Sequence, residues 1–366
     1  MMLLVVNSGS SSVKLAVFDG ARLQAHAQVD RIGSGGPHDH AQALGLGLDQ
    51  LAVRADLIRA AAHRVVHGGA DLTQTCRITP EVETALAACA DLAPLHNPPA
   101  LAGIAAVAQL WPALPQYAAF DTAFHASNPE VATAYALPLA ERARGLRRYG
   151  FHGLSYAAIV RKVQEIAKDS LSKRMLSFHL GNGSSACAIL NGQSVASSMG
   201  FSPLDGLTMG TRPGALDPAV VLDLVARHGL DATGQMLNRA SGLKALGGTN
   251  DMRALHAAGT PDARFAIDHF CYWAARHGAS LCAAMGGVDA ITFTGGIGEN
   301  DGIIRSRILN QLAFLGAVLD GDANARGDQA LHAAGSAVAI WIVPADEERQ
   351  IALEAGAIMA QEEKPR

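Results

Sequence analysis

An excess of charge of one sign is absent from this sequence of 366 residues. Lysine and arginine together number 29 and aspartate and glutamate 33, which gives a formal net charge of −4. Proteins that bind nucleic acid typically present a basic face, and this balance offers none. Long hydrophobic runs are also absent, since no run approaches the roughly 20 residues that a membrane helix needs. The apolar start over residues 3–6 is too short for a signal peptide, so we expect neither a nucleic-acid partner nor a membrane partner.

Paired cysteines are missing as well. The five cysteines form no CxxC motif and are odd in number; they are Cys76, Cys89, Cys187, Cys271 and Cys282. We therefore expect no disulfide framework and interpret the cysteines as reduced, mostly buried thiols of a cytoplasmic protein. What the chain does have is length and apolar content. With 366 residues, 49% of them hydrophobic, it predicts two domains with a substantial core.

The most informative segment covers residues 3–19. It reads as an apolar strand, a Ser/Gly turn and a second strand with alternating faces. Glycine lets the backbone approach a ligand closely, and successive N–H groups in such a turn form an anion site. Lys14 adds a positive charge there, and Asn7 is suited to hold a phosphate oxygen or a metal-bound water. The segment is no Walker A loop, and by itself it is equally typical of an ordinary hairpin.

A second copy of this pattern favours the functional interpretation. Residues 175–192 again read as strand, Gly/Ser turn and strand, and residues 9–20 lie over residues 181–192 without a gap. Similarity at so long a period indicates two related domains and not a solenoid. Two such hairpins that face each other across a cleft would hold the phosphates of a nucleotide from both sides.

The rest of the chain predicts an α/β fold with mixed sheets followed by helices. Several elements are expected from caps, periodicity and Pro or Gly punctuation. In chain order they are an exposed loop over 33–47, a helix over 51–62, a strand at 63–66, helices over 80–92 and 97–110, a strand over 116–120, a joining loop over 121–150, a helix over 153–168, a Gly/Pro-rich loop over 199–217, helices from 218 and over 261–285, a strand over 291–294 with a glycine turn and a helix after it, a strand over 337–343 and a helix over 346–361.

Several polar residues stand in positions that suit phosphate chemistry. Arg64 and Arg212 lie in glycine-flanked loops, where a guanidinium contacts a carboxylate or phosphate with two nitrogens; a loop arginine is more often solvated. Asp121 at a strand end and Glu347 at a helix start carry oxygens suited to Mg²⁺, although a glutamate at a helix start is also explained by the helix dipole. His152 is either a buried neutral histidine or a donor to a reacting oxygen.

Taken together, the motifs resemble the acetate kinase family, which belongs to the acetate and sugar kinase/Hsp70/actin superfamily. They follow the family order over nearly the whole chain. The resembling segments are VNSGSSSVK at 6–14, HRVVHGG at 63–69, APLHNPP at 93–99, FDTAFH at 120–125, YGFHG at 149–153, HLGNG at 179–183, MGTR at 209–212, DMR at 251–253, GGIGEN at 295–300 and ADEE at 345–348.

The resemblance implies a fold and an assembly. The fold is two related ribonuclease-H-like (actin-like ATPase) domains with a nucleotide cleft between them. One domain would cover residues 1–148 plus about 348–366, and the other, which binds nucleotide and forms a homodimer, residues 149–347. The implied reaction is the reversible transfer of a phosphoryl group from ATP to acetate, which gives acetyl phosphate and ADP, with Mg²⁺ or Mn²⁺ as the metal.

Carried over position by position, the resemblance also implies roles for individual residues. The metal ligands are Asn7 and Glu347. The catalytic residues are Asp121, His152 and Arg212. The substrate residues are Arg64 for the carboxylate and Val66, Leu95, Phe151 and Pro203 for the apolar part. The ATP residues are Lys14, His179, Leu180, Gly181, Asn182, Gly183, Asp251, Met252, Arg253, Gly296, Ile297, Gly298, Glu299 and Asn300.

Other activities stay open at this stage. A propionate or other short-chain acyl kinase is the nearest alternative. The same fold serves chaperones and filament proteins, but a chaperone would need a long C-terminal peptide-binding part. The chain also departs from the family pattern, because ASNP follows His125 where the family usually has QTMP, and Pro213 follows Arg212 with the loss of one acidic position. These departures concern the geometry of two loops and not the reaction class.

Overall fold

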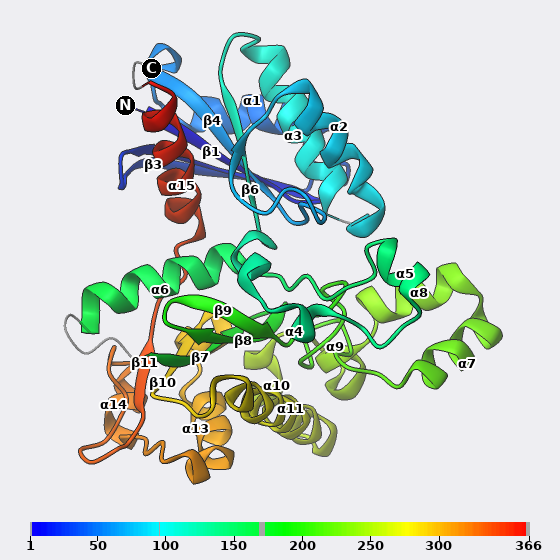
Figure 1. Cartoon of the computed structure of the whole chain (residues 1–366), viewed down its shortest axis with the longest axis vertical. Coiled ribbons are helices and arrows are strands. Elements are labelled where there is room, and N and C mark those ends of the chain that lie inside the picture. The colour runs from blue at the N-terminus through cyan, green and yellow to red at the C-terminus, as the bar shows by residue number, and fades with distance from the viewer. Residues whose placement is uncertain (1, 95, 168–172, 364–366) are drawn as a thin grey trace. The chain divides into compact units, whose positions relative to one another are not determined.

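The computed structural model describes residues 2–94, 96–167 and 173–363 (Figure 1). By its internal contacts the chain divides into two compact units. Unit 1 comprises Met1–Ala126, Gly153–Ala158 and Asp346–Arg366, and unit 2 comprises Ser127–His152 and Ile159–Ala345. The domain boundaries expected near residues 148 and 347 stay a prediction, because this division describes packing and not independent folding.

Unit 1 is built on a six-stranded mixed sheet with the strand order β3-β2-β1-β4-β6-β5. β1 pairs antiparallel with β2 and parallel with β4, and β4 pairs parallel with β6. The strands are β1 (Met2–Ser8), β2 (Ser12–Asp19), β3 (Arg22–Asp30), β4 (Ile58–Val65), β5 (Cys76–Arg77) and β6 (Gln116–Phe120). The hairpin and the strand over 116–120 predicted from the sequence are confirmed.

Helices cover both faces of this sheet because successive side chains of a strand point to opposite sides. Leu4 and Val6 of β1 pack in one cluster with side chains of α1 (His40–Leu51) and α3 (Asn97–Leu110). Leu3 and Val5 pack on the other side against α15 (Glu347–Glu362). The last helix therefore returns to the first strand, as expected.

Unit 2 repeats this plan. Its five-stranded sheet has the order β11-β10-β7-β8-β9, with β7 antiparallel to β8 and parallel to β10. The strands are β7 (Arg174–Leu180), β8 (Ser184–Leu190), β9 (Gln193–Ser197), β10 (Ala290–Thr294) and β11 (Ala339–Ile342). The long helix α11 (Pro261–Met285) packs on the sheet, with Gly278 directly against the ring of Phe178. The predicted α/β class with two related units is confirmed.

The remaining helices connect these strands. They are α2 (Pro80–Ala88), α4 (Glu130–Thr133), α5 (Leu139–Ala143), α6 (Gly153–Ala167), α7 (Pro218–His228), α8 (Leu230–Arg239), α9 (Gly242–Gly247), α10 (Met252–Ala258), α12 (Gly295–Asn300), α13 (Gly302–Gln311) and α14 (Gly321–Arg326), with single 3₁₀ turns at Ala55–Leu57, Ala90–Leu92, Ala123–Ser127 and Ala313–Leu315. In the part of the chain that the structure describes, no helix combines the length and the apolar character that a bilayer crossing requires.

Several predicted elements differ from the structure. The loop expected over 33–47 ends early, because Asp39 caps α1 by accepting a hydrogen bond from the Gln42 backbone N–H at 2.8 Å. The helix expected over 51–62 does not form: Ala55–Leu57 is a 3₁₀ turn and residues 58–62 begin β4, whose Ala60, Ala61 and Ala62 are fully buried. The strand expected at 63–66 coincides with the end of β4. An alanine run favours a helix, but burial on both faces of a parallel sheet outweighs that preference. The expected loop over 121–150 contains short helices.

Candidate active site

The carboxyl ends of the parallel strands in unit 1 bring several predicted site residues together. Asn7 lies near the end of β1, Arg64 near the end of β4, and Asp121 directly after β6. Parallel strands end at the same edge of a sheet, which is where ligands bind in open α/β sheets. Glu347 joins this edge as the first residue of α15.

Arg64 is the centre of this cluster. Its Nε and Nη2 donate to the two carboxylate oxygens of Asp121 at 3.0 and 2.6 Å, and its Nη1 lies 3.5 Å from the Asn7 Oδ1. The Glu347 Oε2 lies 3.9 Å from Nε. Although burial lowers the pKa of Arg64, Asp121 and Glu347 outweigh that effect and raise it, so the guanidinium stays charged. Burial also raises the pKa of the Asp121 carboxyl, and Arg64 opposes that rise.

The oxygen atoms around Arg64 have the chemistry of a magnesium site. Asn7, Asp121 and Glu347 offer amide and carboxylate oxygens, and Mg²⁺ is bound in kinases by one or two such groups together with substrate phosphates. These residues therefore fit the predicted metal.

Lys14 lies directly opposite Asn7 in the pairing of β1 with β2. Glu348 follows Glu347 in α15, and burial raises the pKa of its carboxyl while the Lys14 charge lowers it. The edge thus has a cation on the first hairpin within electrostatic range of the carboxylates of α15.

The turn between β1 and β2 is held by a residue that the sequence placed in a solvated loop. The His40 Nε2 lies 2.8 Å from the carbonyl oxygen of Gly9, and the Ile32 N–H donates to the carbonyl of Ser11 at 3.1 Å. Because a peptide group is planar and trans, holding the Gly9 carbonyl aims the N–H of Ser10 to the opposite side. No motif or spacing in the sequence signals this contact, since His40 lies 31 residues from Gly9.

Unit 2 gathers a second group of predicted residues. His152 has a backbone φ of +58°, in the left-handed region that a residue with a side chain seldom adopts. Its Nδ1 lies 2.8 Å from the Ser185 Oγ, and its ring stacks on that of His179 with 4.2 Å between centroids. Such strain is kept where the surroundings determine the conformation fully, and here two neighbours orient the imidazole.

Arg212 lies in the same group. A Cβ placed on Gly183 would lie 2.7 Å from the Arg212 Nη2 and 3.3 Å from the His152 Nε2, so an alanine there would displace the Arg212 guanidinium. The Arg212 Nη1 donates to the Pro203 carbonyl at 2.7 Å. Burial lowers the pKa of Arg212. Among the described residues no carboxylate forms an ion pair with this guanidinium, which leaves its charge for a ligand.

A cavity of about 550 Å³ in unit 2 collects three of the segments predicted to bind ATP. Its lining residues are Gly181, Asn182, Asn250, Asp251, Met252, Arg253, Gly296, Ile297, Asn300 and Asp301. The GGIGEN segment forms the short helix α12 and not the expected turn before a helix. Glu299 points elsewhere, because its Oε1 accepts from the backbone N–H groups of Gly295 and Ala345.

The residues predicted for the apolar part of the substrate are spread over the chain. Val66 follows β4 in unit 1 and is half-buried. Phe151 is buried in unit 2, and Pro203, also in unit 2, is half-buried. Leu95 lies outside the described residues.

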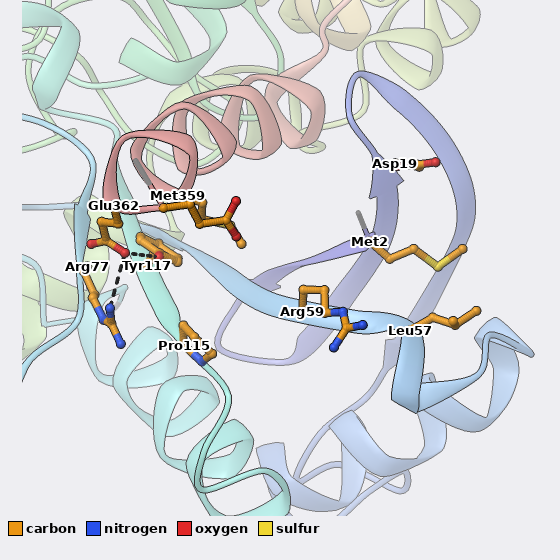
Figure 2. A pocket seen from close by; sticks show the side chains of 10 residues that line it. Met2, Asp19, Leu57, Arg59, Arg77, Pro115, Tyr117, Met359 and Glu362 are labelled. Carbon is orange, nitrogen blue, oxygen red and sulfur yellow. Dashed lines mark hydrogen bonds and ion pairs between the residues drawn. The ribbon is translucent and has the colours of Figure 1, made fainter. Parts of the chain in front are cut away.

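A larger cavity of about 850 Å³ lies in unit 1 at the amino ends of the parallel strands, away from the Arg64 cluster (Figure 2). It is lined from the beginnings of β1, β4 and β6 and from the end of α15. Its polar groups bind one another, since the Tyr117 hydroxyl donates to Glu362 at 2.7 Å and Arg77 pairs with Glu362 at 3.3 Å. These contacts join α15 to the sheet, and the described residues that line this cavity include none of those predicted for the site.

Comparison with known proteins agrees with this geometry. The model of the acetokinase family matches residues 33–353. The chain is 42% identical to an acetate kinase of Rhodopseudomonas palustris, with 96% of each chain covered. It is 43% identical to an acetate kinase of Nitrobacter hamburgensis, with 96% of this chain and 94% of that one covered.

Solved structures give the same result. The acetate kinase of Porphyromonas gingivalis superposes with a TM-score of 0.90 at 34% identity, with 98% of this chain and 99% of that one covered. A propionate kinase of Francisella tularensis superposes with a TM-score of 0.91 at 34% identity, with 96% and 98% covered. The family match and the nearly full-length relatives show that the chain belongs to the acetokinase family.

Proposed function

We propose that this protein is an ATP:acetate phosphotransferase. The observation that supports the proposal is the Arg64 cluster, in which Asp121 holds a charged guanidinium beside the side-chain oxygens of Asn7 and Glu347. The chain that carries this cluster is 42% identical to an acetate kinase. In the reaction, an acetate oxygen forms a bond to the γ-phosphorus of ATP while the bond from that phosphorus to the bridging oxygen breaks. The products are acetyl phosphate and ADP.

The residues suit a reaction whose barrier comes from the repulsion between two anions and not from proton transfer. An acetate carboxylate is already an anionic nucleophile and needs no strong base, but it must approach another anion. We assign Arg64 to the carboxylate, with Asp121 as the residue that orients the guanidinium. Arg212 and His152 would meet the transferring phosphoryl group, since preorganised donors stabilise charge that develops in the transition state. Lys14 and the residues around the unit 2 cavity would hold the nucleotide.

We assign Mg²⁺ to the oxygens of Asn7 and Glu347, where it would neutralise phosphate charge when bound. Replacing Glu347 with alanine should raise the Mg²⁺ concentration needed for half-maximal activity at least tenfold and leave the circular dichroism spectrum unchanged. An unchanged magnesium titration would instead assign Glu347 to the stabilisation of the α15 N-terminus.

A propionate kinase is the second candidate, because the Francisella tularensis propionate kinase superposes as well as the acetate kinases do. One methylene of a substrate changes discrimination in a fixed apolar pocket by only about 1–3 kcal/mol. We expect propionate to react less efficiently than acetate, and Val66→Ala to narrow the difference.

We also propose a cytoplasmic homodimer that forms through unit 2. α7 has no buried residue, and Leu222 and Leu230 are 71% and 75% exposed. Phe265 and Tyr272 of α11 are also exposed. Aspartate at both Leu222 and Leu230 should convert a dimer to a monomer in sedimentation velocity. The five free cysteines fit a reducing compartment.

The substrate is tested by a coupled assay of ADP release with MgATP and acetate, propionate or butyrate. The proposal predicts that kcat/KM decreases in that order. Equal or greater efficiency with butyrate would contradict the small pocket, and no ADP release with any short carboxylate would contradict the enzyme assignment.

A further inference from the structure

The 550 Å³ cavity of unit 2 has two walls that come from distant parts of the chain. One wall is the start of α10, where Asp251 caps the helix by accepting from the Arg253 N–H at 2.9 Å and pairs with the Arg253 guanidinium at 3.1 Å. The other wall is α12 with Asp301 at its end. The separation of these walls sets the width of the cavity.

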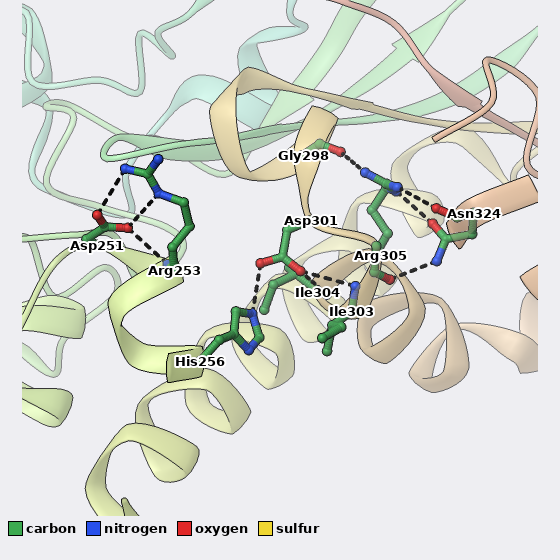
Figure 3. A network of polar contacts seen from close by, with 10 residues as sticks. Asp251, Arg253, His256, Gly298, Asp301, Ile303, Ile304, Arg305 and Asn324 are labelled. Carbon is green, nitrogen blue, oxygen red and sulfur yellow. Dashed lines mark hydrogen bonds and ion pairs between the residues drawn. The ribbon is translucent and has the colours of Figure 1, made fainter. Parts of the chain in front are cut away.

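His256 joins the two walls. Its Nε2 lies 2.9 Å from the Asp301 Oδ2, and both side chains are largely buried. The other oxygen of Asp301 accepts from the backbone N–H groups of Ile303 and Ile304 and so caps α13 (Figure 3). Within the described residues this is the one hydrogen bond between α10 and the α12–α13 segment. Asp301 is thus fixed by α13 and presents one oxygen to α10.

The carbonyl groups near the end of α12, next to Asp301, are held by a second residue. Arg305, which is 1% exposed, donates to the carbonyls of Gly298 and Glu299 at 2.9 Å and to the Asn324 Oδ1 at 2.8 Å. Figure 3 shows these contacts on the opposite side of Asp301 from His256. α12 therefore has a rigid support in its own unit, against which a bond from His256 can position α10.

We infer that the His256–Asp301 pair is a positioning pair for the nucleotide, because it fixes the start of α10, with Asp251 and Arg253, at a set distance from α12. The inference rests on the proposed function, in which this cavity takes the nucleotide. Neither side chain belongs to the proposed acetate or metal residues. Loss of the bond should therefore weaken nucleotide binding and leave the acetate site unchanged.

The test measures the affinity for ADP by titration calorimetry together with steady-state kinetics. His256→Ala should weaken ADP binding about tenfold and raise the KM for ATP by a similar factor, with the KM for acetate within twofold of wild type. His256→Gln, which keeps a donor, should recover much of the affinity. In combination with Asp301→Asn, which keeps the oxygen that caps α13, His256→Ala should cause little further loss.

Arg326→Gln is the matched control, since it breaks the exposed Arg326–Asp328 ion pair of the same unit; it should leave ADP affinity unchanged.

Unchanged ADP affinity in folded His256→Ala, or equal loss of ATP and acetate affinity with a lowered melting temperature, would overturn the inference. If His256→Ala fails to fold, His256→Phe, which keeps a ring but has no donor, takes its place: lower ADP affinity than Arg326→Gln supports the inference, and equal affinity overturns it. ADP binding is measured without acetate, so a failure of the proposed reaction is distinguishable from a failure of this pair.

Discussion

The two hairpins that begin the sheets of unit 1 and unit 2 share a strand order but differ at their turns. In β1–β2, Asn7 lies opposite Lys14, and the turn is held from outside by His40. In β7–β8, His179 lies opposite Ser185, and the turn is held by its own Ser184, whose Oγ donates to the Gly181 carbonyl at 3.0 Å.

The difference shows how a repeated fold acquires two chemistries. The gapless overlay places Asn7 over His179 but Lys14 over Ala186, so the pairing register differs by one residue between the hairpins. A shift of one residue changes which side chains share a face of the sheet. The first hairpin consequently presents an amide and a cation, and the second presents a histidine beside a glycine that Arg212 approaches closely.

The largest effect is expected for Arg212, the residue that distinguishes the second turn. An arginine that meets a transferring phosphoryl group contributes roughly 10³–10⁵ to turnover. Arg212→Ala should lower kcat by that order and change the KM values for ATP and acetate much less. Arg212→Lys should restore little, because an ammonium lacks the planar fork. Near wild-type kcat in Arg212→Lys, or an effect of Arg212→Ala on KM alone, would return Arg212 to a binding or surface role.

The glycines of the two turns offer a matched comparison. In Gly183→Ala the new methyl would lie 2.7 Å from the Arg212 Nη2, whereas in Gly9→Ala it would lie 3.5 Å from Ser12, an ordinary contact. Displacing a catalytic group by about 1 Å costs roughly 10²-fold in rate. We expect kcat to fall about that much in Gly183→Ala and less than threefold in Gly9→Ala. Equal effects in the two variants would contradict the distinction between the turns.

A smaller effect is expected for the outside support of the first turn. His40→Ala removes one hydrogen bond, which contributes about 0.5–1.5 kcal/mol, while the bond from the Gly9 N–H to the Ser12 carbonyl is kept. The KM for ATP should rise about 2–10-fold. His38→Ala is the control, because His38 is exposed. A KM that His40→Ala leaves at the control value would show that the turn holds its shape without the histidine.

The last prediction concerns the stability of unit 1 in acid, which is a different property from turnover. Burial lowers the pKa of His63 and His67 in unit 1 to about 4, below the ordinary value of 6.5. As the pH falls below 6.5, the unfolded state gains protons that the folded state does not, so stability is lost toward pH 4, by at most about 1.4 kcal/mol per pH unit for each histidine. Hydrogen exchange, corrected for intrinsic rates, should show this loss in β4, and His63→Gln should reduce it. A pH-independent opening of β4 would contradict the prediction.

The sequence predicted those elements whose signals are local. The hairpins have alternating patterns, and α11 begins at Pro261 after Thr260, whose side chain caps it as expected of such a start. The end of β4 falls within the strand expected at 63–66, but its first half was assigned to a helix. Ala60, Ala61 and Ala62 favour a helix unless both faces are buried, and burial is decided by distant parts of the chain.

The candidate site likewise contains residues that the sequence predicted and contacts that it did not. Arg64, Asp121 and Arg212 were proposed as site residues because their residue types and local motifs can be recognised in the sequence. Two contacts that support the first turn and the unit 2 cavity were not predicted, since His40 contacts Gly9 over 31 positions and His256 contacts Asp301 over 45. Such contacts follow no period and no motif, so only the folded structure brings them together.

The most direct test of the proposed reaction traps its product. Purified protein with MgATP, acetate and hydroxylamine should form acetohydroxamate at a rate equal to ADP release, and Arg212→Ala should lower both rates by the same factor of roughly 10³–10⁵. Normal ATP binding without hydroxamate from acetate or any other short carboxylate would contradict the assignment of this chain as a carboxylate kinase.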